Sequence, residues 1–127
     1  MSQYAQYAST VNNAQAVISA SNTNRDGTGT IVDVLTGATN GTRIDDLSIL
    51  ATGATTAGMI RLYISDGTNT RLWKEISVQV NTPSGTNQTW SYYLMDLGLI
   101  LESGWKLRAS THNAETFHII VTRAGDF

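Results

Sequence analysis

The sequence predicts an all-β fold, an antiparallel β-sandwich that is jelly-roll-like and has about eight strands. Short runs of alternating apolar and polar residues recur at spacings of roughly 8–14 residues, as in sandwiches and barrels. A strong hairpin signal lies within residues 57–80, and no window shows the sustained apolar period of about 3.6 residues that a helix needs. An immunoglobulin-type sandwich is the alternative, although its Cys…Trp…Cys spacing is absent.

The hairpin consists of two alternating runs on either side of an Asp-Gly step at residues 66–67. Successive side chains of a strand point to opposite faces, so the odd and even positions of the first arm separate. Aliphatic residues share one of these faces: Ile60, Leu62 and Ile64. Arg61 and Tyr63 share the other. Lys74 interrupts the apolar alternation of the second arm, which predicts either a β-bulge near residues 73–74 or an edge position for this strand.

The remaining elements follow from the same alternation and from loops rich in Gly, Thr and Asn. Before the hairpin, residues 15–20 alternate weakly, 30–35 form a β-branched run, and 43–51 carry apolar residues at every second position. After the hairpin, the expected strands cover residues 89–95, 97–101, 105–110 and 117–123. The expected core combines the inward positions of the hairpin and of the last two strands: Ile60, Leu62, Ile64, Trp105, Leu107, Phe117, Ile119 and Val121.

The chain divides into an arm and one domain. Residues 1–13 are rich in Gln, Ser, Asn and Ala and are expected to form a flexible N-terminal arm, followed by a β-sandwich domain over residues 14–127. Tyr4 and Tyr7 give the arm aromatic side chains, which a purely solvating tail does not need. A mobile terminus is one interpretation, and an arm that orders by adding a strand or by wrapping a neighbouring subunit is the alternative that these tyrosines favour.

Composition excludes several classes of function. The 127 residues contain no cysteine, so disulfides, thiol nucleophiles and cysteine-ligated zinc are absent. The net charge is −2 and the eight basic residues are scattered, which argues against nucleic-acid binding. No apolar run approaches the roughly 18–20 residues that span a bilayer.

The side chains that could carry chemistry do not form a convincing site. His112, Glu115 and His118 could ligate a metal, but the His-x-His pair that cupin enzymes use is absent. The paired carboxylates Asp45 and Asp46 could bind calcium or act as an acid and a base, but adjacent strand residues face opposite ways.

The glycine-rich segment at residues 26–29 superficially resembles a phosphate-binding loop. It precedes a predicted strand rather than a helix, so turn glycines with positive φ are the better interpretation. We expect no catalytic residue, metal or cofactor, and no enzymatic activity.

Aromatic and aliphatic side chains on the solvent-facing side of predicted strands are the better candidates for a site. Tyr63, Trp73 and Tyr93 lie opposite the aliphatic stripes of their strands, and Ile120 and Leu50 are apolar residues at such positions too. Displayed aromatic rings can stack on sugars or anchor protein interfaces. In a chain with only 14% charged residues we favour a protein interface.

Residues 22–127 resemble small structural proteins of tailed bacteriophages, notably in the phrases TTAGMIRLYISDG and GWKLRASTHNAE. The resemblance implies a β-sandwich or jelly-roll virion protein of the capsid decoration (cement) type. It also implies a homotrimer that contacts the major capsid protein on the capsid surface, after assembly in the host cytoplasm. The alternatives are a tail, neck or fibre component that binds a glycan receptor, and a carbohydrate-binding jelly-roll module.

Overall fold

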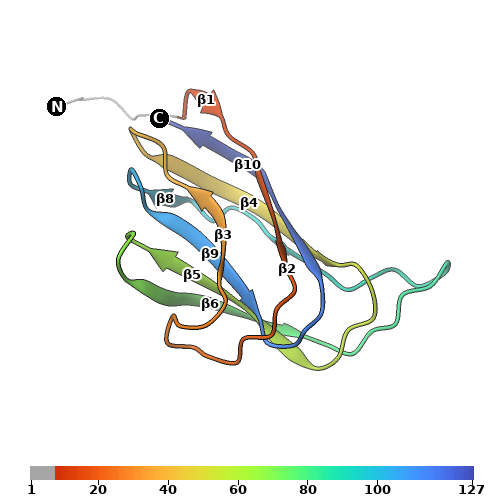
Figure 1. Ribbon diagram of the computed structural model, residues 1–127. Coiled ribbons are helices and arrows are strands. Elements are labelled where there is room, and N and C mark those ends of the chain that lie inside the picture. The colour runs from red at the N-terminus through yellow and green to blue at the C-terminus, as the bar shows by residue number, and fades with distance from the viewer. Residues whose placement is uncertain (1–7) are drawn as a thin grey trace.

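The computed structural model describes residues 8–127, which form ten strands and no helix (Figure 1). The strands are β1 (Thr10–Val11), β2 (Ala14–Ile18), β3 (Val32–Thr36), β4 (Thr42–Ala51), β5 (Gly58–Ser65), β6 (Thr70–Val78), β7 (Ser91–Leu94), β8 (Leu99–Leu101), β9 (Lys106–Thr111) and β10 (Phe117–Asp126). Within the described residues no helix is long and apolar enough to cross a membrane. The all-β prediction is confirmed.

The strands form two packed antiparallel sheets. In one sheet the order is β1–β10–β4–β7, with β2 also paired to β10 and β8 also paired to β4. In the other the order is β3–β9–β5–β6. β1 and β2 pair with the same side of β10, and β7 and β8 pair with the same side of β4, so each of these two pairs fills one position in the sheet. The sandwich therefore has eight strand positions, and the chain crosses repeatedly from one sheet to the other. This is the double-sheet arrangement of a jelly roll.

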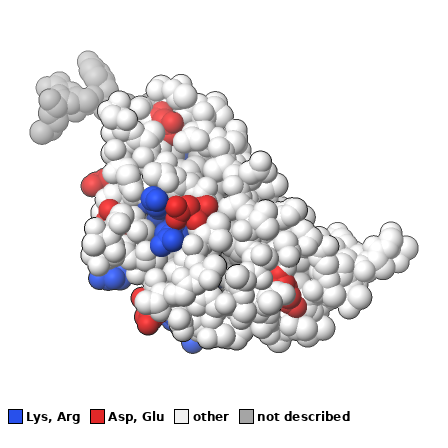
Figure 2. Space-filling view, in the orientation of Figure 1, with Lys and Arg blue, Asp and Glu red and all other residues white. Residues whose placement is uncertain are grey.

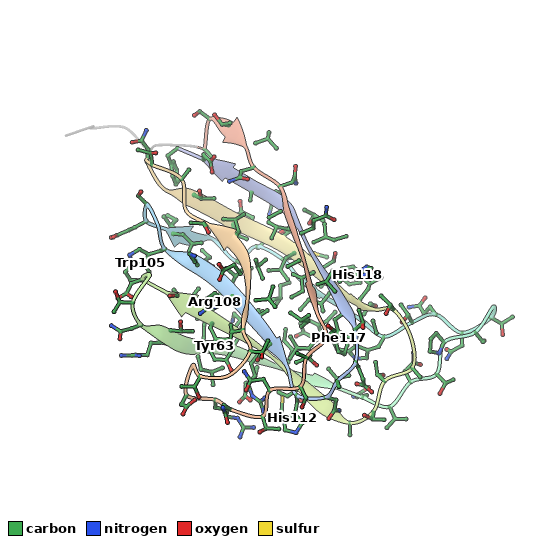
Figure 3. All side chains as sticks on the ribbon, in the orientation of Figure 1. Tyr63, Trp105, Arg108, His112, Phe117 and His118 are labelled. Carbon is green, nitrogen blue, oxygen red and sulfur yellow. The ribbon has the colours of Figure 1, made fainter. Side chains whose placement is uncertain are left out.

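The core lies between the two sheets and consists of the inward residues of the central strands. Seven of the eight residues expected there pack in it: Ile60, Leu62, Leu107, Phe117, Ile119 and Val121 are fully buried, and Ile64 is partly buried. Trp105 was wrongly expected in the core. It precedes β9 in a turn in which its N–H donates to the carbonyl of Glu102, so its ring lies at one end of the sandwich and is 36% exposed (Figure 3).

The bulge expected in the second hairpin arm is present. Leu62 pairs with Lys74, but the next residue, Tyr63, pairs with Leu72, so Trp73 is the extra residue of β6. Because of the bulge, the side chains before it point to the opposite face from the one that simple alternation predicts. Trp73 therefore packs against the core, and Leu72 is 36% exposed.

The sandwich starts earlier in the chain than the sequence predicts. Thr10 and Val11 form β1 and pair with Asp126 and Gly125 of β10. Residues 10–13 therefore belong to the sandwich rather than to the expected arm.

Residues 19–31 cover the outer face of the β3–β9–β5–β6 sheet. Asn22 fixes this loop by donating to the carbonyls of Thr28 and Thr30 at 3.0 Å each. Gly27, with φ of 87°, lies so close to the next hairpin that a Cβ there would collide with the carbonyl of Thr70. The glycines of this loop serve a turn, as the sequence predicts, and no helix follows them.

Candidate functional site

The outer face of the β1–β10–β4–β7 sheet presents two rows of side chains that run across four strands. Strand pairing fixes their order. One row consists of Val17, His118, Leu50 and Ser91, and the other consists of Gln15, Ile120, Ser48 and Tyr93. These eight residues are called the β10 face below.

The β10 face exposes apolar surface without charge. Val17 is 53% exposed, Ile120 is 42% exposed and Tyr93 is 57% exposed, whereas Ser48 between the last two is nearly buried. A shallow hollow of about 400 Å³ runs between β2 and β10 and is lined by residues that include Val17 and Ile120. No Lys, Arg, Asp or Glu belongs to the two rows, so a partner could cover them without desolvating a charge.

An ion network limits this face toward the start of β4. Arg123 binds the Asp46 carboxylate with Nε and Nη2 at 3.1 Å each, and its Nη2 also lies 2.7 Å from Asp96 Oδ1. The backbone N–H of Asp96 and the Arg123 guanidinium hold the pKa of Asp46 below its ordinary value of 3.8. Asp46 therefore stays ionised, and its carboxylate oxygens are already bound by Arg123. The network forms a polar rim beside the apolar rows, an arrangement that protein interfaces share.

The structure brings together two of the six predicted interface residues and places two others, Tyr63 and Trp73, on the opposite sheet. Tyr93 and Ile120 lie in one row of the β10 face, on either side of Ser48. Trp73 is half-buried at the bulge of β6, on the other sheet, with the Lys74 Nζ 4.9 Å from its ring centre. Tyr4 and Tyr7 lie outside the described residues.

The expectation that Tyr63 is displayed was wrong. Its parity does place it on the outer face of its sheet, but residues 19–31 cover it and its exposure is 0%. Its hydroxyl donates to the carbonyl of Asn24 at 2.9 Å. Tyr63 therefore holds the covering loop in place and offers no surface to a partner.

Arg61, which the sequence places beside Tyr63, is also buried and was not recognised as a structural centre. Its Nη1 donates to the Asn22 carbonyl at 3.1 Å, its Nε lies 3.1 Å from Glu75 Oε2, and its Nη2 lies 3.2 Å from His112 Nδ1. The hydrogen bond to His112 requires an unprotonated Nδ1, because a guanidinium only donates. The network ties the covering loop to β5, to β6 and to the turn that follows β9.

The residues considered for metal binding are not gathered. His112 faces Arg61, whereas His118 lies on the β10 face, well apart from it (Figure 3). Glu115 accepts hydrogen bonds from the N–H and the hydroxyl of Thr56, at 2.8 and 3.0 Å. Among residues 8–127 no group of three His, Asp or Glu side chains could hold a metal ion.

Asp45 and Asp33 are also bound by basic side chains. Asp45 Oδ1 lies 2.9 Å from Arg43 Nε, and Asp33 binds both Lys106 Nζ and Arg108 Nε, at 3.0 and 2.7 Å. Figure 2 shows the visible charges confined to a few small groups on a largely uncharged surface. The adjacent pair Asp45 and Asp46 therefore splits between two different ion pairs.

No protein-family model matches the sequence, and no curated protein matches it. Among solved structures, the fold is similar to a chain described as "Cyanophage Pam1 capsid asymmetric unit". The TM-score is 0.43 and the sequence identity is 17%, over 94% of this chain and 89% of that chain.

Proposed function

We propose that the protein is a non-enzymatic structural protein of a tailed-phage virion, acting as a capsid decoration protein. In this proposal homotrimers bind the major capsid protein on the capsid surface and stabilise the head. The observation that carries the proposal is the β10 face, where Val17, Ile120 and Tyr93 expose apolar surface on three of its four strands and no Lys, Arg, Asp or Glu belongs to the face.

The chemistry of this face suits protein assembly. Exposed apolar residues that lie side by side mark interaction sites, and aromatic anchors at the centre of an interface carry much of its binding energy. Ser48 is nearly buried between Ile120 and Tyr93, so the two larger side chains stand on either side of a small one. The middle of each row lies on the paired central strands β10 and β4, and its ends lie on β2 and β7.

The sequence resemblance to small virion proteins supports the same function. A decoration protein needs a stable sandwich and apolar anchors but no reactive groups. A trimer fits the threefold and quasi-threefold positions of an icosahedral shell. Many copies bound to one shell also gain avidity without new contacts.

Sedimentation and capsid binding test the proposal with one variant and one matched control. Ile120→Asp places a carboxylate in the β10 face, where covering it costs desolvation. We expect the variant to fold, to lose self-association and to bind capsids at least about 30-fold more weakly, as for a hot spot of about 2 kcal/mol.

The control is Val80→Asp, at a residue that is 72% exposed but lies beyond the end of β6. It should assemble like the wild type. A wild-type protein that is monomeric and does not bind capsids would overturn the proposal. Binding to tail or fibre particles instead would favour the alternative position in the virion.

A further inference from the structure

A groove lies beside the β10 face, at the edge of the sandwich, and of the eight residues of that face only Ser91 lines it. It lies between β6 and β7, the edge strands of the two sheets, and has a volume of about 580 Å³. A second hollow of about 270 Å³ continues it along the loop between these strands and shares Gln79, Trp90 and Ser91 with it. Figure 1 shows this loop projecting from one end of the sandwich.

Two aromatic rings line the groove. Tyr92 pairs with Ile49 and follows the inward parity of β7, but it is 42% exposed because β7 is an edge strand. Trp90 packs edge-on against the buried Phe117, with ring centres 5.6 Å apart. The planes of Trp90 and Tyr92 lie within 17° of each other, with centres 6.4 Å apart. The core therefore fixes one ring, and the second ring extends the aromatic surface toward solvent.

Uncharged polar groups surround these rings. Gln79 lines both hollows and Gln88 lines the second one; the side-chain amides of these residues make no hydrogen bond with any described residue, so both can donate to and accept from a ligand. The charged lining residue, Glu75, is already bound by Arg25 Nε at 2.7 Å and by Arg61 Nε at 3.1 Å. A ligand in this groove thus meets aromatic faces and amides rather than an unpaired charge.

We infer that this groove binds a neutral saccharide chain, with Trp90 and Tyr92 stacking against sugar rings and with Gln79 and Gln88 hydrogen-bonding to hydroxyl groups. A pyranose ring has an apolar C–H face and a rim of hydroxyls that donate and accept, which matches both features. Acidic polymers fit poorly because the groove offers them no free cation. The inference does not depend on the proposed assembly function, since Tyr92 and Tyr93 point to opposite sides of β7.

The adjacent tyrosines provide a matched pair of variants. The probe is a glycan array that carries neutral hexose and N-acetylhexosamine oligosaccharides beside sialylated and sulfated ones. A bound neutral oligosaccharide is then titrated against the protein by tryptophan fluorescence. We expect the wild type to bind neutral glycans on the array. In the titration, Tyr92→Ala and Gln79→Ala should each raise the Kd at least 10-fold, and Tyr93→Ala should bind with the affinity of the wild type.

Tyr92→Phe separates stacking from folding, because it keeps the ring and should retain most of the affinity. Thermal unfolding of each variant shows that the fold is intact. The inference is overturned if no neutral glycan binds, if acidic glycans alone bind, or if Tyr92→Ala binds as tightly as Tyr93→Ala. Loss of capsid binding in Tyr92→Ala without any glycan binding would instead assign the groove to a protein contact.

Discussion

Replacing Arg61 by methionine tests whether the buried guanidinium holds the covering loop on its sheet. The side chain is 2% exposed and binds Glu75, the Asn22 carbonyl and His112. Removing one partner from a buried ion pair costs about 3–5 kcal/mol. Glu75 is 29% exposed and keeps Arg25, so the lower value applies and we expect a loss of about 3 kcal/mol.

The assay is urea unfolding followed by tryptophan fluorescence, together with thermal unfolding. An unfolding entropy of about 2.1 cal/mol/K per residue gives about 0.27 kcal/mol/K for 127 residues, so Arg61→Met should lower Tm by about 11 °C. The control is Arg25→Met, which removes the exposed partner of the same carboxylate and should cost at most about 1 kcal/mol. The reasoning fails if Arg61→Met stays within about 1 kcal/mol of the wild type, or if both variants cost the same.

Three further predictions concern stability. Tyr63→Phe removes the hydroxyl bound to the covering loop and should cost about 1 kcal/mol in urea unfolding, whereas no loss would show that this bond is dispensable. Hydrogen bonds from arginine side chains and a backbone amide lower the pKa of Glu75 and Asp46 below 4.5 and 3.8. These two carboxylates therefore stabilise the fold at pH values above 4.5 and 3.8, and this stabilisation is lost as the pH falls through their lower folded-state pKa values. We expect the urea concentration at the unfolding midpoint to decrease when the pH is lowered below about 4, and an increase would contradict the argument. Gly27→Ala should lower the free energy of unfolding by at least about 2 kcal/mol, because the new Cβ would collide with the backbone of Thr70. Gly67→Ala is the control: φ is also positive there but the space is open, so the loss should be about 1 kcal/mol. Equal losses for the two variants would contradict the steric argument.

Local alternation was enough to predict most of the fold. The period of two identified the inward residues of the hairpin, such as Ile60 and Leu62, and the break at Lys74 located the bulge. Trp105 was misplaced because its parity continues that of β9 although the strand begins one residue later. The alternation of apolar and polar residues does not show where a strand begins, nor whether its first side chains reach the core.

The sequence could not predict which outward-facing side chains are covered by segments distant in the chain. Tyr63 and Tyr93 both lie on the outer faces of their strands, but a loop some 40 residues earlier in the chain buries Tyr63. The alignment of Ile120 with Tyr93 depends on the register of three strands, and no local pattern encodes it. Tyr92 has the inward parity of β7, and its exposure follows only from the position of β7 at a sheet edge.

A reconstruction of the intact virion tests the central claim most directly. The account predicts sandwich density in trimers on the capsid surface, with the Ile120 and Tyr93 row covered by a neighbouring subunit. Density in the tail or fibres, or trimers whose β10 face remains open to solvent, would contradict it.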